Sequence, residues 1–217
     1  MIAGSANRFK NYSAKQPKNF EKGICSQIRA KIPKHICAIA WDDSKGRNFL
    51  FPKFKEEKVV DNKKLNPDHV KEIAKIVNSS PYFSLLSMKI RSIYRGRSDL
   101  EVEIQNKHLQ PYGMVHGGVC ASLVDAAAFW AVYPQTAADI GLTTVEIKLN
   151  YLAPASKGRL IARGKSIKVG KTICLGEASV EDDKGNLVAY GISTMMVLDS
   201  VRIQGQSKLP PKFLDES

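Results

Sequence analysis

A histidine and two glycines open an apolar segment that contains one acid. His116, Gly117 and Gly118 begin the segment, and Asp125 follows the histidine by nine positions. An ionised carboxylate in apolar surroundings is costly unless it has a partner. A buried ion pair or a hydrogen bond to a neighbouring strand would be a purely structural reason for Asp125. The functional alternative is a general base or a nucleophile.

The two glycines suit a helix start that binds an oxygen atom. The first turn of a helix exposes N–H groups without partners inside the helix and carries a partial positive charge. Because glycine lets a ligand approach the backbone closely, a carbonyl oxygen bound at Gly117 would be polarised, as in an oxyanion hole. The simpler alternative is that both glycines only permit a tight turn.

The spacing of these groups predicts a second copy of the chain. Gly117 and Asp125 are eight residues apart, which corresponds to about 12 Å along one helix. Two groups so far apart cannot both contact one carbonyl carbon at about 3 Å. If they share a site, Asp125 comes from a partner subunit, and the protein is a symmetric dimer with two sites across its interface.

The elements around this motif follow an α+β pattern. Asn66 and Pro67 suit the N-cap and the first position of an amphipathic helix, which we expect to end at Pro81. A second helix is expected from about Gly117 to Tyr133, and its apolar residues surround the axis, so it must be enclosed. Alternation and turn signals predict six strands, at residues 83–96, 97–105, 143–151, 159–169, 172–182 and 186–198. This order predicts an antiparallel sheet wrapped around one long apolar helix, and it does not fit a parallel βαβ fold.

Charge and sequence pattern together divide the chain into three parts. Residues 1–65 hold 15 Lys and Arg against 6 Asp and Glu, so they carry +9 of the net charge of +12. They show no sustained period and are expected to form a weakly ordered basic extension. Residues 66–198 are expected to form the domain, and residues 199–217 a loose C-terminal tail.

Composition argues against several classes of protein. The most apolar run is shorter than the roughly 20 residues that cross a bilayer, so no membrane span is expected, and no secretory signal is evident. The four cysteines, Cys25, Cys37, Cys120 and Cys174, show neither CxxC spacing nor a Cys/His cluster. This predicts no metal site, no disulfide framework and a cytoplasmic location. Cys120 is expected to be a small buried residue.

Two segments, HLQPYGMVHGGVCASLVDAA and TTVEIKLNYLAPA, resemble the hotdog-fold acyl-CoA thioesterases of the phenylacetate-degradation (PaaI-like) group. The resemblance covers about residues 66–198. It implies a hotdog fold, an acyl-CoA substrate, a homodimer or a dimer of dimers, and hydrolysis without a cofactor or a metal.

The resemblance also implies roles for four catalytic residues. Gly117 would donate its N–H to the thioester carbonyl, and Asp125 of the opposite subunit would activate water or attack directly. Gln110 occupies a position at which relatives orient the carbonyl or the water, and Thr144 matches a hydroxyl position near that water.

A substrate-binding set follows from the same resemblance: His116, Gly118, Asn150, Lys171 and Thr172. We expect His116 to hold the turn at the helix start. Asn150, Lys171 and Thr172 match positions that contact the nucleotide or the pantetheine of CoA. A Lys in a turn can pair with phosphate as a point charge, although Lys171 is equally well explained as a solvated turn residue.

Two other functions are open. One is a regulator that senses acyl-CoA and uses the basic extension. DNA binding would require a helix-turn-helix or a comparable element, and residues 1–65 show no two-helix pattern, so nucleic-acid binding is not expected. The other is a hotdog hydratase or dehydratase, which would pair a catalytic histidine with an acid. None of the four histidines, His35, His69, His108 and His116, lies in such a motif.

Overall fold

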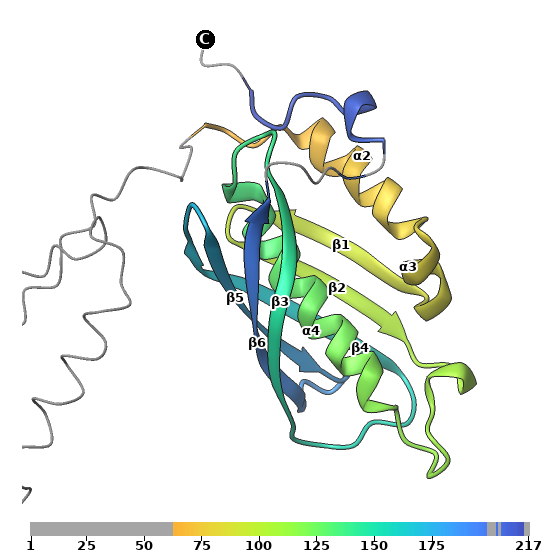
Figure 1. The fold of residues 1–217 in the computed structure, drawn as a ribbon. Coiled ribbons are helices and arrows are strands. Elements are labelled where there is room, and N and C mark those ends of the chain that lie inside the picture. The colour runs from red at the N-terminus through yellow and green to blue at the C-terminus, as the bar shows by residue number, and fades with distance from the viewer. Residues whose placement is uncertain (1–62, 199–202, 204, 215–217) are drawn as a thin grey trace, which may run out of the picture. The chain divides into compact units, whose positions relative to one another are not determined.

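A computed structural model of the chain describes residues 63–198, 203 and 205–214 (Figure 1). Residues 1–62, which make up most of the basic extension expected over residues 1–65, lie outside this range. The strands are β1 (Met88–Tyr94), β2 (Arg97–Glu103), β3 (Gly141–Tyr151), β4 (Arg159–Val169), β5 (Ile173–Glu181) and β6 (Leu187–Leu198). They form one sheet with the order β1-β2-β4-β5-β6-β3, and every neighbouring pair is antiparallel. The predicted antiparallel sheet is therefore confirmed.

The helix α4 (Gly117–Val132) lies along the concave side of this sheet (Figure 1). Its backbone approaches the strands so closely that two glycines are required. A Cβ atom on Gly164 of β4 would lie 2.1 Å from the carbonyl oxygen of Ala127, and one on Gly176 of β5 would lie 2.8 Å from that of Ala128. The prediction that this helix is enclosed is confirmed, and Cys120 is buried within it as expected.

By length and apolar composition, one helix among the described residues, Gly117–Gln135, could cross a membrane. It consists of α4 and the short η2 (Tyr133–Gln135). Because 61% of its apolar window is buried inside the protein, its apolar character is explained by the core that it occupies.

The helix α2 (Pro67–Asn78) begins as predicted. The side chain of Asn66 accepts a hydrogen bond from the N–H of Asp68 at 3.0 Å, and Pro67 occupies the first turn. Buried Ile73 and Val77 lie on the face that packs against β1, at the sheet edge opposite β3 (Figure 1).

The first predicted strand is partly wrong, because a second short helix precedes β1. Residues Pro81–Leu86 form α3. Pro81 does more than end α2, since its fixed φ also suits the first turn of a new helix. Ser87 then ends α3 in the left-handed conformation, with a φ of 50°, so that the strand begins only at Met88.

The alternation predicted for β3 is interrupted by a bulge. Thr144 pairs with Met195 and Glu146 pairs with Thr194, which leaves Val145 as the extra residue. Val145 is 52% exposed. An extra residue reverses the side on which the later residues point, so Thr144 and Ile147 both face α4 instead of lying on opposite sides of the sheet.

The C-terminal segment over residues 205–214 is packed, which differs from the loose tail that we expected. The N–H of Asn66 donates to the carbonyl oxygen of Lys212 at 2.9 Å, and the Asn66 side chain donates to Pro211 at 2.9 Å. Leu65 and Phe213 form an antiparallel bridge. These contacts join the segment to the start of α2.

Lys212 anchors this segment from inside the protein. Its side chain is 3% exposed, and Nζ donates to the carbonyl oxygen of Thr136 at 2.7 Å, to Thr136 Oγ1 at 3.0 Å and to the carbonyl oxygen of Ala137 at 3.4 Å. Nζ also lies 4.0 Å from the centroid of the Tyr133 ring. The Tyr133 hydroxyl contacts His69 Nε2 at 2.9 Å, so Lys212 connects the C-terminal segment with the end of α4 and with α2.

Replacing Lys212 by methionine should destabilise the fold in a pH-dependent way. The variant leaves buried carbonyl groups without donors, which costs about 1–3 kcal/mol. Burial, aided by the charge of Arg95 and opposed by that of Asp139, lowers the pKa of Lys212 to about 7. The unfolded chain keeps this amine protonated to a pH of about 10. Folding therefore releases a proton in this window, and the stability of the wild type rises relative to the variant as the pH rises.

The measurement is the free energy of unfolding in urea at pH 6 and pH 9, for the wild type, Lys212→Met and the exposed control Lys208→Met. We expect Lys212→Met to be the less stable at pH 9 and the difference to shrink at pH 6, while the control follows the wild type. A difference that is equal at both pH values would contradict a titrating Lys212.

Candidate active site

Asp125 is held by two hydroxyl groups from the sheet. It lies on α4 and is half-buried. Its Oδ1 atom accepts hydrogen bonds from Thr144 Oγ1 of β3 at 2.8 Å and from Ser193 Oγ of β6 at 2.9 Å. Within the described residues, no side chain forms a salt bridge with Asp125 and no donor contacts Oδ2. The hydrogen bond to neighbouring strands, one of the two structural reasons considered for Asp125, is thus present, but it occupies one carboxylate oxygen and leaves the other available.

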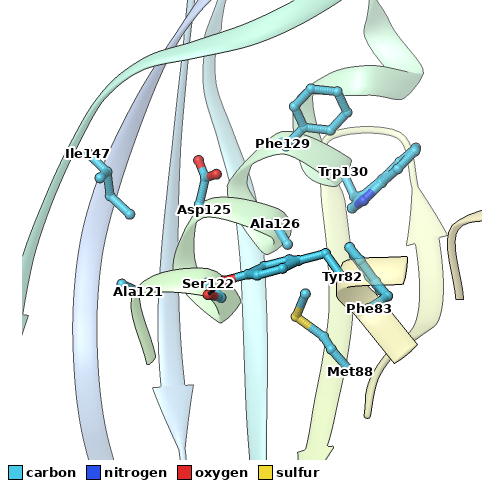
Figure 2. A pocket seen from close by; sticks show the side chains of 10 residues that line it. All are labelled: Tyr82, Phe83, Met88, Ala121, Ser122, Asp125, Ala126, Phe129, Trp130 and Ile147. Carbon is cyan, nitrogen blue, oxygen red and sulfur yellow. Dashed lines mark hydrogen bonds between the residues drawn. The ribbon is translucent and has the colours of Figure 1, made fainter. Parts of the chain in front are cut away.

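The carboxylate lines an open groove of about 430 Å³ between α4, α3 and β3 (Figure 2). Apolar side chains form most of its wall, including Phe83, Met88, Phe129 and Trp130. A carboxylate beside an apolar groove is suited to a substrate that has a reactive polar group on an apolar tail.

The N–H groups at the start of α4 differ in whether they have acceptors. His116 is the N-cap, and its Nδ1 atom accepts a hydrogen bond from the N–H of Gly118 at 2.9 Å. The N–H of Val119 donates to the carbonyl oxygen of His116 at 2.9 Å. The N–H of Gly117 has no acceptor among the described residues. His116 therefore holds the turn by accepting from the N–H of Gly118. The N–H of Gly117 is left to donate to an oxygen atom of a ligand.

Gly117 and Gln110 line a second pocket of about 430 Å³, together with Cys120 and Tyr151. The aromatic ring of Tyr151 lies against Gly117, where a Cβ atom would come within 2.8 Å of it. A larger residue at this position would need the Tyr151 ring to shift, and that ring is the outer end of a side chain that is 58% exposed.

The predicted catalytic residues therefore fall into two pairs on one chain. Thr144 contacts Asp125, which lines the groove, and Gln110 and Gly117 line the second pocket. Asp125 does not line that second pocket and Gly117 does not line the groove. This agrees with the prediction that one chain cannot bring both groups to one carbonyl.

The residues predicted to contact CoA are not brought together in one chain. Asn150 is exposed near the end of β3, where it pairs with Tyr190. Lys171 and Thr172 lie in the turn between β4 and β5, at the opposite end of the sheet, and the carbonyl oxygen of Thr172 accepts from the N–H of Val197 at 2.8 Å. None of the three lines either pocket, so their role remains a prediction.

Sequence reasoning missed Ser193. It is fully buried in β6, with 0% exposure. A signal was available, because Ser193 shares the inward side of β6 with Gly191 and Met195. A polar residue at an inward position of a strand requires a buried partner, and Asp125 is that partner.

Comparisons with known proteins identify the family of this domain. Residues 112–189 match a family model described as "Thioesterase superfamily". The chain is 32% identical to a Halobacterium salinarum protein named "Putative esterase" over 114 residues, which cover 50% of this chain and 74% of that protein. The chain belongs to the thioesterase superfamily. The matched range includes Gly117, Asp125 and Thr144, whereas Ser193 and Gln110 lie outside it.

Two other relatives of the thioesterase domain have more specific names. The mouse (Mus musculus) acyl-coenzyme A thioesterase 13 is 25% identical over 58% of this chain and 92% of its own length. The 1,4-dihydroxy-2-naphthoyl-CoA hydrolase of Listeria monocytogenes is 28% identical over 52% of this chain and 91% of its own. The crystal structure of a Haemophilus influenzae thioesterase superposes with a TM-score of 0.57 at 20% identity, covering 61% of this chain and 92% of that one. The domain has the hotdog fold of this superfamily.

Ser193→Ala should lower kcat for thioester hydrolysis by about tenfold, the effect of losing roughly 1.4 kcal/mol from one hydrogen bond to a charged group. Without the Ser193 hydroxyl, Oδ1 of Asp125 keeps one of its two donors, and the carboxylate can rotate away from the reactive orientation. The measurement is kcat and KM for thiol release, with Ser179→Ala as a control on the adjacent strand.

The control should have the kcat of the wild type. The melting temperature of each variant distinguishes a misoriented Asp125 carboxylate from a destabilised fold. A well-folded Ser193→Ala protein with unchanged kcat would show that the two hydroxyl groups do not hold Asp125 for catalysis.

Proposed function

We propose that this protein is an acyl-CoA thioesterase of the PaaI-like type, which hydrolyses a thioester to the free acid and CoA at a site shared by two subunits. The observation that supports this most is the division of the reactive groups between two pockets. The groove holds Asp125, and the second pocket holds Gln110 and Gly117. A two-fold pair of chains would join the groove of one subunit to the second pocket of the other.

In the proposed reaction, the N–H of Gly117 and the positive end of α4 polarise the thioester carbonyl. Developing negative charge on that oxygen is stabilised by a donor that is already in place. Oδ2 of the partner's Asp125 takes a proton from water as the water oxygen bonds to the carbonyl carbon. The C–S bond then breaks, and the CoA thiolate leaves and takes up the proton. Direct attack by Asp125 is the alternative, with hydrolysis of the resulting anhydride.

The supporting residues keep these groups in position. Thr144 and Ser193 donate hydrogen bonds to Oδ1 of Asp125 and leave Oδ2 available to a ligand in the groove. Gln110 orients the carbonyl or the water with its side-chain amide. His116 fixes the turn through Nδ1, so that Gly117 keeps a free N–H. The scheme uses neither a metal nor a redox cofactor.

The edge of the sheet supports a dimer. β3 is the last strand in the sheet order, and its outer edge has no partner strand among the described residues. Val145, Tyr151 and Leu152 on and after this strand are each more than half exposed. Because an exposed edge with apolar side chains favours pairing with another chain, we propose that β3 contributes to a homodimer, alone or within a dimer of dimers.

The choice of CoA follows from the relatives, two of which are named for CoA thioesters. Asn150, Lys171 and Thr172 remain the proposed contacts with CoA, and Gly118 remains a proposed part of the substrate site. The proposed location is the cytoplasm. A regulator that senses acyl-CoA would bind the same thioesters without hydrolysing them, and it would not need Oδ2 of Asp125 to be available.

Asp125→Asn should lower kcat at least about 100-fold, because a general base contributes 10²–10⁴-fold and the amide cannot accept the proton. The measurement is thiol release from aromatic and straight-chain acyl-CoAs. The exposed Asp68→Asn at the start of α2 is the control and should retain full activity. Tight binding of acyl-CoA without turnover by the wild type would favour the sensor, and full activity of Asp125→Asn would remove this residue from the mechanism.

Mixing Asp125→Asn chains with Gln110→Ala chains, each of which we expect to be impaired by itself, should restore part of the activity. In a heterodimer of Asp125→Asn and Gln110→Ala chains, one site carries both changes and the other carries neither. Random mixing places half of the subunits in such heterodimers, so about a quarter of the wild-type kcat should return for equal amounts of chains. The measurement is thiol release after joint refolding, with separately refolded chains as the control. Verified heterodimers without activity would exclude a site shared in this way.

A further inference from the structure

Tyr82 crosses the groove that contains Asp125 (Figure 2). It belongs to α3, which has no buried residue, and its side chain is 56% exposed. The Tyr82 hydroxyl lies 2.7 Å from Ser122 Oγ. Because Ser122 donates its own hydrogen to the carbonyl oxygen of Gly118 at 2.8 Å, Tyr82 is the donor in the bond between the two side chains.

This bond lies one helical turn from the carboxylate. Ser122 and Asp125 are separated by three residues on α4, so they lie on the same face of the helix. The Tyr82 ring spans from α3 to that face (Figure 2). An acyl chain that begins at a carbonyl beside Asp125 and continues along the apolar wall would pass the Tyr82 ring.

The wall beyond Tyr82 is suited to such a chain. Phe83 and Met88 lie on the side of α3 and β1, and Phe129 and Trp130 lie on α4, with their rings 5.1 Å apart. The groove ends among these side chains without a charged residue other than Asp125 in its lining. Burial of an apolar tail there is favourable, because it removes apolar surface from water.

Phe83 and Leu86 pack α3 against the core, whereas Tyr82 and Leu85 are 56% and 63% exposed. The Tyr82 ring can move while α3 stays in place. Tyr82 is therefore held over the groove chiefly by its hydrogen bond to Ser122 and by the contacts of its ring.

We infer that Tyr82 sets the size of the acyl group that the protein hydrolyses. This inference rests on the proposed thioesterase function. With the bond between Tyr82 and Ser122 formed, the groove accepts short acyl groups, and a long chain must displace the ring. The matched thioesterase range begins at residue 112, so α3 and Tyr82 lie outside it.

The test is the ratio of kcat/KM for hexadecanoyl-CoA to that for butanoyl-CoA. Tyr82→Ala opens the groove, and we expect this ratio to rise at least about tenfold over the wild type. A change of this size is typical of the discrimination between substrates by an apolar pocket. Tyr82→Phe and Ser122→Ala each remove the hydrogen bond but keep the ring, and they should raise the ratio by a smaller factor. Leu85→Ala changes the same helix outside the groove lining, and it is the matched control that should leave the ratio unchanged.

The possible outcomes separate the two proposals. A folded wild type that hydrolyses none of the aromatic and straight-chain acyl-CoAs would overturn the proposed function and this inference with it. Turnover by the wild type with the same ratio in Tyr82→Ala and Tyr82→Phe would overturn only the role of Tyr82. If Tyr82→Ala proves unstable by thermal denaturation, Tyr82→Phe and Ser122→Ala decide the outcome.

The mixed dimer supplies a second test. Its one intact site uses Asp125 from the Gln110→Ala chain, and Tyr82 of that chain lines the same groove. Adding Tyr82→Ala to the Gln110→Ala chain should shift the selectivity of the mixed dimer, whereas adding it to the Asp125→Asn chain should not. The reverse pattern, or an equal shift in both, would overturn the assignment.

Discussion

A half-buried carboxylate in an apolar helix is the feature on which the site depends. Two hydroxyl groups from two different strands bind the same oxygen of Asp125. A hydrogen bond to a charged group contributes more than one between neutral groups, so this pair of bonds both offsets desolvation and fixes the carboxylate. The second oxygen is thereby left for a ligand.

The backbone of the sheet is shaped to make those two bonds. The bulge at Val145 turns Thr144 toward α4, and the regular pairing of β6 places Ser193 inward beside it. The glycines on β4 and β5 allow α4 to lie close to the sheet. The position of Asp125 therefore follows from contacts on several strands and not from α4 alone.

Much of the fold was predictable from local patterns. The start of α2, the extent of α4 and five of the six strands were close to their observed bounds, because caps, alternation and an unbroken apolar run act over short distances. In the structure Thr144 contacts Asp125, and both lie apart from Gly117 within one chain, as the spacing of Gly117 and Asp125 had indicated. The catalytic roles of these residues stay predictions. The resemblance to a known family supplied Thr144, which simple alternation would have placed on the other side of the sheet.

The differences arise where distant segments decide the local structure. Ser87 adopts its left-handed conformation at the junction of α3 and β1, where Lys107 donates to its hydroxyl at 2.8 Å. Alternation along β6 places Ser193 inward, but its partner Asp125 is identified only when β6 is placed against α4. The packing around Lys212 depends on oxygens more than seventy positions earlier in the chain. Windows of a few residues do not contain such information.

The contact between the two ends of the domain has a consequence for its connectivity. The N–H of Leu214 donates to the carbonyl oxygen of Lys64 at 2.9 Å, next to the bridge between Leu65 and Phe213. Domains whose ends lie together tolerate circular permutation. A short linker could join residue 214 to residue 64, and new chain ends could be opened in the exposed turn at Gly185. Such a permuted chain would keep every strand pair of the sheet and would change only the order of the strands along the sequence.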